Sequence, residues 1–448
     1  MVIIGAGVGG LFTAIELVNK GYPAKDILLV DKGPMLSKRK CFVNNETPCK
    51  KCKVCSISNG VGGTGSFSDS KLNFDVTGRV GGDLYEIFSE YQIACQLNEV
   101  YNIYEQFGLN EFKSKEYKPN LTINEPGIQL ADCLTIHLGT ENSRIVYQRM
   151  IDYLLSKGVT IKANYEVKEL SKEKGRFIIN NEITTDKVVL AIGRSGNKLM
   201  RYFANKLNLN MKTGRVDIGV RVETLNEYMS YLNENFYEAK LYLKGRFNDT
   251  TRVFCTNPGG YVSIESYDNK LYLANGHAYA NNKTENTNFA LLVSRTFNED
   301  TPNPLEDYMY PLIQAMNSLG KGQVIMQSLK DIKLNRRSTE QRIKDLDIKP
   351  TIKAYAGDIT SVMPYRHMID ILEAIELLDK LAPGINGDNT ILYAPEAKFH
   401  ANKIAIDENC MSSMNNLYCI GDSSGWSRGL TTAASMGIIV AKDILNRS

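Results

Sequence analysis

The stretch that most constrains this fold is GAGVGG at residues 5–10, directly after three β-branched residues. The β-branched residues predict a short buried strand. Gly5, Gly7 and Gly10 then have the spacing G-x-G-x-x-G, which binds dinucleotides when it joins a strand to a helix. In such a turn the first glycine permits the tight bend, the second lets the backbone approach a pyrophosphate, and the third lets helix and strand pack closely.

The residues after this turn complete a dinucleotide-binding unit. Residues 11–20 predict a helix with one apolar stripe, and residues 26–30 predict a second buried strand. That strand ends at Asp31, near the position where an acidic residue accepts hydrogen bonds from an adenosine ribose. The helix N-terminus offers free N–H groups and partial positive charge to phosphates. We therefore predict a dinucleotide site at this turn.

The C-terminal region indicates FAD rather than NAD. Residues 416–422 predict a short apolar strand that ends in Gly421 and Asp422, and in two-dinucleotide-fold flavoproteins such an aspartate meets the ribityl chain of FAD. Residues 431–445 predict a helix that begins at Thr431, behind Gly429 and Leu430. Its N-terminus would stabilise negative charge on the reduced flavin ring. An NAD dehydrogenase does not need its C-terminus to return to the cofactor.

The middle of the sequence fits the same plan. Residues 185–190 predict an apolar strand that runs into the turn AIGRSG, which brings Gly193 near the cofactor. Residues 142–157 predict a helix and residues 159–167 the next strand, with Val167 at the adenine.

A second glycine run, GVGGTG at residues 60–65, repeats the spacing without the context. No strand is predicted before it, and the segment after it lacks the apolar stripe of a helix. We interpret it as a loop whose backbone approaches FAD, because glycine allows close approach and positive φ. The predicted cofactor contacts here are Gly62, Gly63, Gly65 and Ser66. Lys71 follows, either as a charge near phosphate or substrate, or as a solvated lysine.

The predicted fold class is α/β. A Rossmann-like FAD-binding domain with a parallel sheet (residues 1–200 and 391–448) is interrupted by an inserted α+β substrate domain (residues 201–390) with a mostly antiparallel sheet. Short alternating segments of the insertion predict strands at 216–224, 239–245, 251–257, 261–266 and 270–276. Helices are predicted at 306–319 and 368–381, and a loop at 281–288.

Together these segments resemble the FAD-dependent dehydrogenases, a largely uncharacterised family that shares the flavoprotein fold of the glutathione-reductase type. The similarity runs along the whole sequence and is most specific in GTGSFSDSKL (63–72) and FCTNPGGYV (254–262). The resemblance implies FAD, an inserted substrate domain and redox chemistry. The sequence departs from the family at Ser70, where relatives usually have glycine, and near His400, where they usually have an aromatic residue.

Four cysteines lie close together just before the second glycine run. Cys49, Cys52 and Cys55 have the spacing C-x2-C-x2-C, and Cys41 precedes them. Four thiolates in a short loop suit a [4Fe–4S] cluster or Zn²⁺. The alternative is a set of free thiols or a reversible disulfide, since neighbouring lysines lower thiol pKa values and the resemblance does not require a metal.

Composition limits the partners. The sequence has 53 basic and 50 acidic residues and a net charge of +3, which argues against a nucleic-acid partner. No apolar run reaches the length of a membrane helix, and no leader pattern is present, so we expect a cytoplasmic protein without a membrane partner.

The expected activity is hydride transfer between flavin N5 and a C–C or C–N bond of a small organic substrate. Catalytic candidates are Arg428 beside the flavin, His400 and Lys71, while Arg221 is a candidate for binding a substrate carboxylate. The electron partner would be NAD(P)H or a ferredoxin-like carrier. The alternatives are a flavoprotein without net redox, such as an isomerase or hydratase, and a redox-sensing or electron-relay flavoprotein that uses the cysteines.

Overall fold

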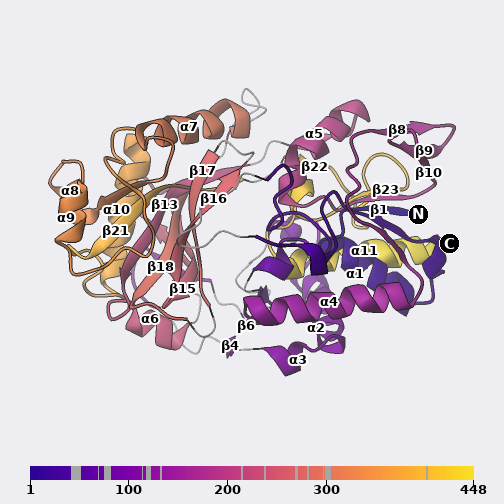
Figure 1. Ribbon diagram of the computed structural model, residues 1–448, viewed down its shortest axis with the longest axis horizontal. Helices are drawn as coiled ribbons and strands as arrows, with labels where there is room; N and C mark the ends of the chain where they lie inside the picture. The colour runs from indigo at the N-terminus through magenta and orange to yellow at the C-terminus, as the bar shows by residue number, and fades with distance from the viewer. Residues whose placement is uncertain are drawn as a thin grey trace. The chain divides into compact units, whose positions relative to one another are not determined.

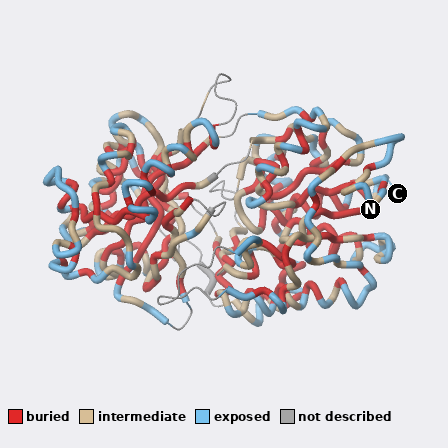
Figure 2. Tube along the Cα trace, turned by 45° about the horizontal axis from the view of Figure 1, so that its top comes forward, coloured by how far each residue is buried: buried red, intermediate tan, exposed pale blue. Residues whose placement is uncertain are grey.

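The computed structural model describes residues 1–41, 52–68, 70–74, 82–113, 115–117, 123–131, 134–212, 215–236, 239–267, 271–279, 282–295, 297, 304–399 and 402–447. The chain forms two compact units (Figure 1). Unit 1 comprises residues 1–116, 133–214 and 401–448, and unit 2 comprises residues 117–132 and 215–400. Each unit has its own buried interior (Figure 2).

Unit 1 is built on a five-stranded parallel sheet. Its order is β23 (Leu417–Cys419), β11 (Val188–Leu190), β1 (Val2–Ile4), β2 (Leu28–Val30) and β7 (Thr160–Lys162). All four neighbouring pairs run parallel. Because parallel strands end at one edge of the sheet, the turns after β1, β11 and β23 lie side by side at that edge.

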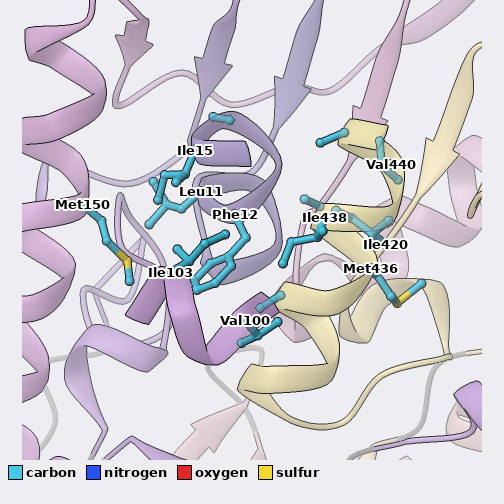
Figure 3. Close-up of a cluster of buried hydrophobic side chains, with 14 of the residues drawn as sticks. Leu11, Phe12, Ile15, Val100, Ile103, Met150, Ile420, Met436, Ile438 and Val440 are labelled. Atoms are coloured by element: carbon cyan, nitrogen blue, oxygen red, sulfur yellow. The ribbon is translucent and has the colours of Figure 1, made fainter. Parts of the chain in front are cut away.

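Two central helices of unit 1 pack through small residues. The second residue of α1 (Val8–Asn19), Gly9, faces α11 (Leu430–Asn446), and a Cβ on Gly437 would lie only 2.5 Å from the Gly9 carbonyl oxygen. Larger apolar side chains of both helices fill the surrounding core (Figure 3). The main further helices of unit 1 are α2 (Glu90–Gln106), α3 (Leu109–Phe112), α4 (Thr140–Ser156) and α5 (Asn197–Lys206).

The remaining strands of unit 1 form three small sheets. They contain β3 (Lys71–Asn73), β6 (Thr135–His137) and β4 (Lys115–Tyr117), then β8 (Leu170–Glu173), β9 (Arg176–Ile179) and β10 (Ile183–Thr185), and finally β12 (Met211–Lys212) with β22 (Lys403–Ile404). None of the described helices in either unit is both long and apolar enough to span a bilayer.

Unit 2 is built on an eight-stranded sheet and a separate hairpin. The sheet order is β20 (Tyr355–Ala356), β19 (Ile325–Ser328), β21 (Thr390–Phe399), β13 (Val216–Leu225), β18 (Asn286–Arg295), β15 (Thr250–Pro258), β14 (Leu241–Lys244) and β5 (Ile128–Leu130). Neighbours are antiparallel except β19 and β20. The hairpin consists of β16 (Tyr261–Tyr267) and β17 (Leu271–His277).

The helices of unit 2 are α6 (Ser230–Asn235), α7 (Tyr310–Leu319), α8 (Leu329–Lys333), α9 (Glu340–Lys344) and α10 (Tyr365–Asp379). A π-helical segment, Leu305–Met309, leads directly into α7. The predicted fold class is thus confirmed as a mixed α/β chain with one parallel sheet and largely antiparallel sheets elsewhere.

One sequence prediction in this unit is wrong. Residues 286–288, predicted as part of a loop, begin the central strand β18. The strand β21 was missed by the sequence analysis. In unit 1 the strand predicted at 159–167 covers only Thr160–Lys162.

Candidate dinucleotide site

The first glycine turn depends on two of its glycines for the fold itself. Gly5 has φ +103°, and a Cβ on it would lie 2.2 Å from the Ala191 carbonyl oxygen at the end of β11. A Cβ on Gly10 would lie 2.1 Å from the carbonyl oxygen of Gly5. Both positions therefore need glycine to let the turn close against neighbouring backbone.

Gly7 is different, because the described residues leave room for a side chain there. Its backbone is extended, with φ −78°, and its nearest neighbour for an added Cβ is the Cα of Gly63 at 3.7 Å, which is ordinary contact. Neither conformation nor internal packing explains a glycine at this position. Close approach of a ligand to the backbone would explain it, and Gly7 also caps the N-terminus of α1.

The second glycine run packs directly onto the first. The Gly62 amide donates to the Ala6 carbonyl oxygen at 2.9 Å. Gly63 has φ +61°, and a Cβ on it would lie 2.7 Å from the Cα of Gly7. The segment is a series of turns that ends in a short 3-10 helix, Gly65–Phe67, so it is not a second strand–turn–helix unit. The structure thus brings the two glycine runs together at the edge of the sheet.

Arg39 holds this second run in place, and the sequence analysis missed it. Its buried guanidinium donates hydrogen bonds of 2.8–3.1 Å to the carbonyl oxygens of residues 56, 57, 61 and 63 and to the Ser66 hydroxyl. Burial lowers the pKa of Arg39 to about 10. The only signal in the sequence was one arginine among the lysines of LSKRK at 36–40. This signal does not distinguish a buried arginine from a member of a solvent-exposed basic segment.

Asp31 has a structural role that the ribose prediction did not include. One carboxylate oxygen accepts from the Ala6 amide at 3.0 Å and the other from the Gly33 amide at 2.9 Å. Burial raises the pKa of the Asp31 carboxyl, and the two amide hydrogen bonds oppose that rise. Asp31 therefore joins the end of β2 to the first glycine turn, and its contact with a ribose stays a prediction.

The ends of β11 and β23 carry two further glycines with the same backbone conformation. Gly193 has φ +61° and Gly421 has φ +74°, and a Cβ on either would meet no described atom within 4 Å. Asp422 follows directly, where its carboxylate accepts from the Ser427 hydroxyl at 3.0 Å and pairs with Arg194 at 3.3 Å. The residues predicted at the ribityl chain are thus at the same sheet edge as the first glycine turn.

Two helix N-termini start at this edge with no acidic residue in their first turns. The N-cap residues, Gly7 of α1 and Gly429 of α11, have no side chain that could bind the free N–H groups. A helix end of this kind has partial positive charge and free N–H groups. The first turn of α11 also meets the second glycine run, since the Leu430 side chain lies 3.1 Å from a Cβ placed on Gly65.

Several predicted residues have contacts of their own within unit 1. The Ser66 hydroxyl donates to the Gly63 carbonyl oxygen at 2.9 Å, and the Thr431 hydroxyl donates to the Asn73 carbonyl oxygen at 2.7 Å. Val167 is 4% exposed and packs in an apolar cluster with strands of the parallel sheet. Lys71 lies in β3 opposite the buried His137 of β6. Their roles toward a cofactor or substrate stay predictions.

Arg428 lies in an ion-pair cluster that precedes α11. Its guanidinium donates to the carboxylate of Asp83, which also accepts from the Lys403 ammonium at 2.9 Å. Lys403 pairs in addition with Glu86 at 2.5 Å. Asp83 was not among the predicted residues, because nothing in the local sequence distinguishes it from a surface aspartate.

The predicted metal site gains no support in the described part of the chain. There, no group of three or more His, Cys, Asp or Glu side chains is arranged to hold a metal ion. Cys41 and Cys52 are exposed and Cys55 is half-buried. Cys49 and the catalytic candidate His400 lie outside the described residues.

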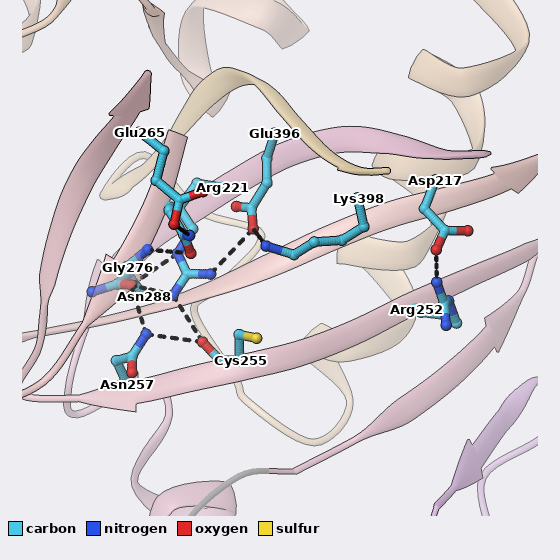
Figure 4. A network of polar contacts seen from close by, with 11 residues as sticks. Asp217, Arg221, Arg252, Cys255, Asn257, Glu265, Gly276, Asn288, Glu396 and Lys398 are labelled. Atoms are coloured by element: carbon cyan, nitrogen blue, oxygen red, sulfur yellow. Dashed lines mark hydrogen bonds and ion pairs between the residues drawn. The ribbon is translucent and has the colours of Figure 1, made fainter. Parts of the chain in front are cut away.

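In unit 2, the side chain proposed for a substrate carboxylate is committed to internal partners. Arg221 is fully buried, and its guanidinium donates to the Asn288 side-chain oxygen, to the Cys255 carbonyl oxygen at 2.8 Å and to Glu396 at 3.5 Å (Figure 4). A Cβ on Gly276 of β17 would lie 2.1 Å from this guanidinium. The arrangement leaves Arg221 enclosed between the sheet and the hairpin.

Comparisons with known proteins link unit 2 to FAD-dependent proteins. Residues 215–399 match the family model described as "FAD-dependent protein, C-terminal domain-like". A curated relative from Clostridium beijerinckii (strain ATCC 51743 / NCIMB 8052), named as an uncharacterized protein, is 23% identical over 474 residues and covers 100% of this chain and 80% of its own length. The resemblance to the glutathione-reductase type stays a prediction.

The similar solved structures include a halogenase, a quinol fumarate reductase and CtdE, two of them solved in complex with FAD. A variant of halogenase PltM in complex with FAD is 10% identical, with a TM-score of 0.41 over 99% of this chain and 69% of that chain. A variant of the E. coli quinol fumarate reductase FrdA is 12% identical, with a TM-score of 0.40 over 100% and 69%. CtdE in complex with FAD is 12% identical, with a TM-score of 0.35 over 98% and 81%. TM-scores this low do not establish a shared arrangement.

Proposed function

We propose that this chain is an FAD-dependent oxidoreductase that binds FAD in unit 1. The observation that carries the proposal is the edge of the parallel sheet, where three glycine turns converge with two helix N-termini whose first turns contain no acidic residue. The family model matched by residues 215–399 supports FAD as the dinucleotide.

Each part of the edge has a proposed role toward the cofactor. The turn of Gly5, Gly7 and Gly10 and the N-terminus of α1 hold the pyrophosphate, and the loop of Gly62, Gly63, Gly65 and Ser66 covers it. Asp31 binds the ribose and Val167 flanks the adenine. Gly193, Gly421 and Asp422 lie along the ribityl chain, and Gly429, Leu430 and Thr431 place the N-terminus of α11 at the flavin ring.

Bound FAD would supply hydride chemistry at N5, with a C–C or C–N bond of a small organic substrate as donor or acceptor. Arg428, which pairs with Asp83, contributes as a fixed positive charge. His400 remains the proposed group for proton transfer, and Lys71 the proposed charge near phosphate or substrate. The proposed electron partner is NAD(P)H or a ferredoxin-like carrier.

The test is spectroscopic and then chemical. The full chain is purified, saturated with FAD and freed of excess ligand, and the flavin released by denaturation is identified by mass. We expect one FAD per chain and bleaching of its absorption under anaerobic NADH, NADPH or reduced ferredoxin. A protein that retains no flavin would contradict the proposal. Retained flavin that none of these donors reduces, and that does not change redox state during turnover of a substrate, would favour an isomerase or hydratase instead.

A further inference from the structure

Asp83 ties three separate segments of unit 1 together in front of α11. Its carboxylate binds the Arg428 guanidinium and the Lys403 ammonium. Its own amide donates to the Trp426 carbonyl oxygen at 2.9 Å. The preceding residue, Gly82, forms an antiparallel bridge with Ser427. Asp83 therefore contacts the loop between β23 and α11 through both its backbone and its side chain.

This loop carries the residues that the proposed function assigns to the ribityl chain and the flavin ring. It begins at Gly421, passes through Ser427, whose hydroxyl binds Asp422, and ends at the N-cap Gly429. The loop is largely buried, and the Trp426 indole donates to the Ile404 carbonyl oxygen at 2.7 Å. A charge placed on this loop is therefore held in one position and is only partly screened by solvent.

The two carboxylates of the cluster differ in how far they are buried. Asp83 is mostly buried and offsets Arg428, which lies next to the positively polarised N-terminus of α11. Glu86 pairs with Lys403 from an exposed position, with 54% of its side chain accessible. Loss of Asp83 would remove a mostly buried negative charge next to Arg428 and α11, whereas loss of Glu86 would change only an exposed and well-screened charge.

We infer that Asp83 is a positioning residue that sets the reduction potential of the bound flavin, through the charge and placement of Arg428. The inference rests on the proposed function, because it requires FAD at the N-terminus of α11. Reduction adds negative charge to the flavin ring, so the Asp83 carboxylate disfavours the reduced form and Arg428 favours it. This pairing keeps the potential lower than Arg428 alone would set it.

The experiment measures the midpoint potential of the FAD-loaded full chain by equilibration with a reference dye. For Asp83→Asn we expect a positive shift of about 30 mV or more, which corresponds to a tenfold change in the two-electron equilibrium. For Arg428→Met we expect a negative shift of similar size, and the double variant should return toward the original potential. Glu86→Gln is the matched control, because it also removes one carboxylate partner of Lys403, and its shift should stay below about a third of the first.

Equal shifts for Asp83→Asn and Glu86→Gln, or no shift in either single variant of the Asp83–Arg428 pair, would overturn the inference. If Asp83→Asn does not fold, the sign of the shift in Arg428→Met decides, since an unchanged or raised potential contradicts the assigned role. Absence of flavin from the unsubstituted chain would instead overturn the proposed function, so the two failures are distinguishable.

Discussion

The central strands of the two units differ in whether they bury charged side chains. In unit 1, β1 has three buried apolar residues, and its polar groups are backbone amides and carbonyls in the glycine turn beyond the strand end. In unit 2, β13 spans ten residues and buries the charged side chains of Asp217, Arg221 and Glu223. Each of these side chains has partners within the unit. Asp217 pairs with Arg252. Arg221 binds Asn288 and Glu396, and Glu223 binds Tyr393 and Thr351.

This contrast distinguishes polar groups that a ligand could bind from polar groups that already have partners within the fold. Side chains in β13 alternate between two faces, so Val220 and Val222 enter the apolar core while Arg221 points the other way. The hydrogen bonds of Arg221 are made within the unit, and breaking them would leave a charged side chain buried without those partners. The edge of the parallel sheet in unit 1 offers backbone groups instead, so a substitution at a glycine without close internal contacts, such as Gly7, should affect binding more than stability.

The largest expected effect comes from breaking the buried cluster of unit 2. Arg221→Met removes the buried cation and leaves the buried Glu396 with Lys398 at 3.4 Å, which should lower the free energy of unfolding by about 3–5 kcal/mol. Denaturant titration followed by circular dichroism measures this loss. The double variant with Glu396→Gln should recover part of it, because the buried carboxylate that has lost its Arg221 partner is then gone. Equal losses in the single and double variants would show that the ion pair is not what the cluster contributes.

A second comparison separates glycines within the first turn. Gly10→Ala forces a methyl group against the Gly5 carbonyl oxygen and should cost about 1–3 kcal/mol of unfolding free energy. Gly7→Ala meets no such contact and should change stability by less than about 0.5 kcal/mol. Thermal unfolding without added FAD measures both. Similar destabilisation by the two substitutions would remove the distinction between fold-determining and ligand-facing glycines.

A pH-dependent effect tests the charged groups of unit 2 at the start of α10. Asp370 is buried close to Asp249, and its pKa is raised from 3.8 to about 6, by burial first and by Asp249 next, while Arg295 at 3.6 Å opposes the rise. A raised carboxyl pKa means that stability present below pH 4 is lost as pH rises toward 6. Asp370→Asn should therefore stabilise the protein by about 1–2 kcal/mol at pH 8 and have little effect at pH 4. A destabilised variant at pH 8 would show that the ion pair with Arg295 outweighs the burial of charge.

The smallest expected effect concerns Ser70, which has φ +44°, a conformation that favours glycine. Ser70→Gly relieves this strain but loses the hydrogen bond from the Ser70 hydroxyl to the Gly65 carbonyl oxygen at 3.0 Å. The two terms should nearly cancel, leaving a change below about 0.5 kcal/mol. A melting-temperature comparison that shows strong destabilisation would make this hydrogen bond a main support of the second glycine run.

Local patterns predicted the parallel sheet and much of its edge. The strand at 2–4 and the helices that became α1, α4 and α11 were found because buried strands and striped helices carry periodic signals. The strand β18 was missed because its first residues are polar. Asn286 and Asn288 bind Glu223 and Arg221 inside the unit, so long-range partners turn a loop-like sequence into a central strand.

The side chains that hold the loops of the candidate site were also hard to predict, because their partners lie far along the chain. Arg39 and Asp83 act through contacts with segments far along the chain, and their neighbours in sequence give no periodic or motif signal. The glycine motifs could be recognised in the sequence because their role depends on local backbone conformation and fixed spacing.

The most direct test of the central claim is an FAD titration of the flavin-free chain, with Gly7→Ala compared with Gly175→Ala. Gly175 is the matched control because a methyl there also meets no described atom within 4 Å, although its φ of +83° makes the substitution locally strained. The account predicts that Gly7→Ala weakens FAD binding at least about tenfold at unchanged folding, since the methyl intrudes on the ligand, and that Gly175→Ala leaves the affinity unchanged. Equal affinity for FAD in the unsubstituted chain and in Gly7→Ala would contradict the claim that unit 1 binds the dinucleotide through the backbone of this turn.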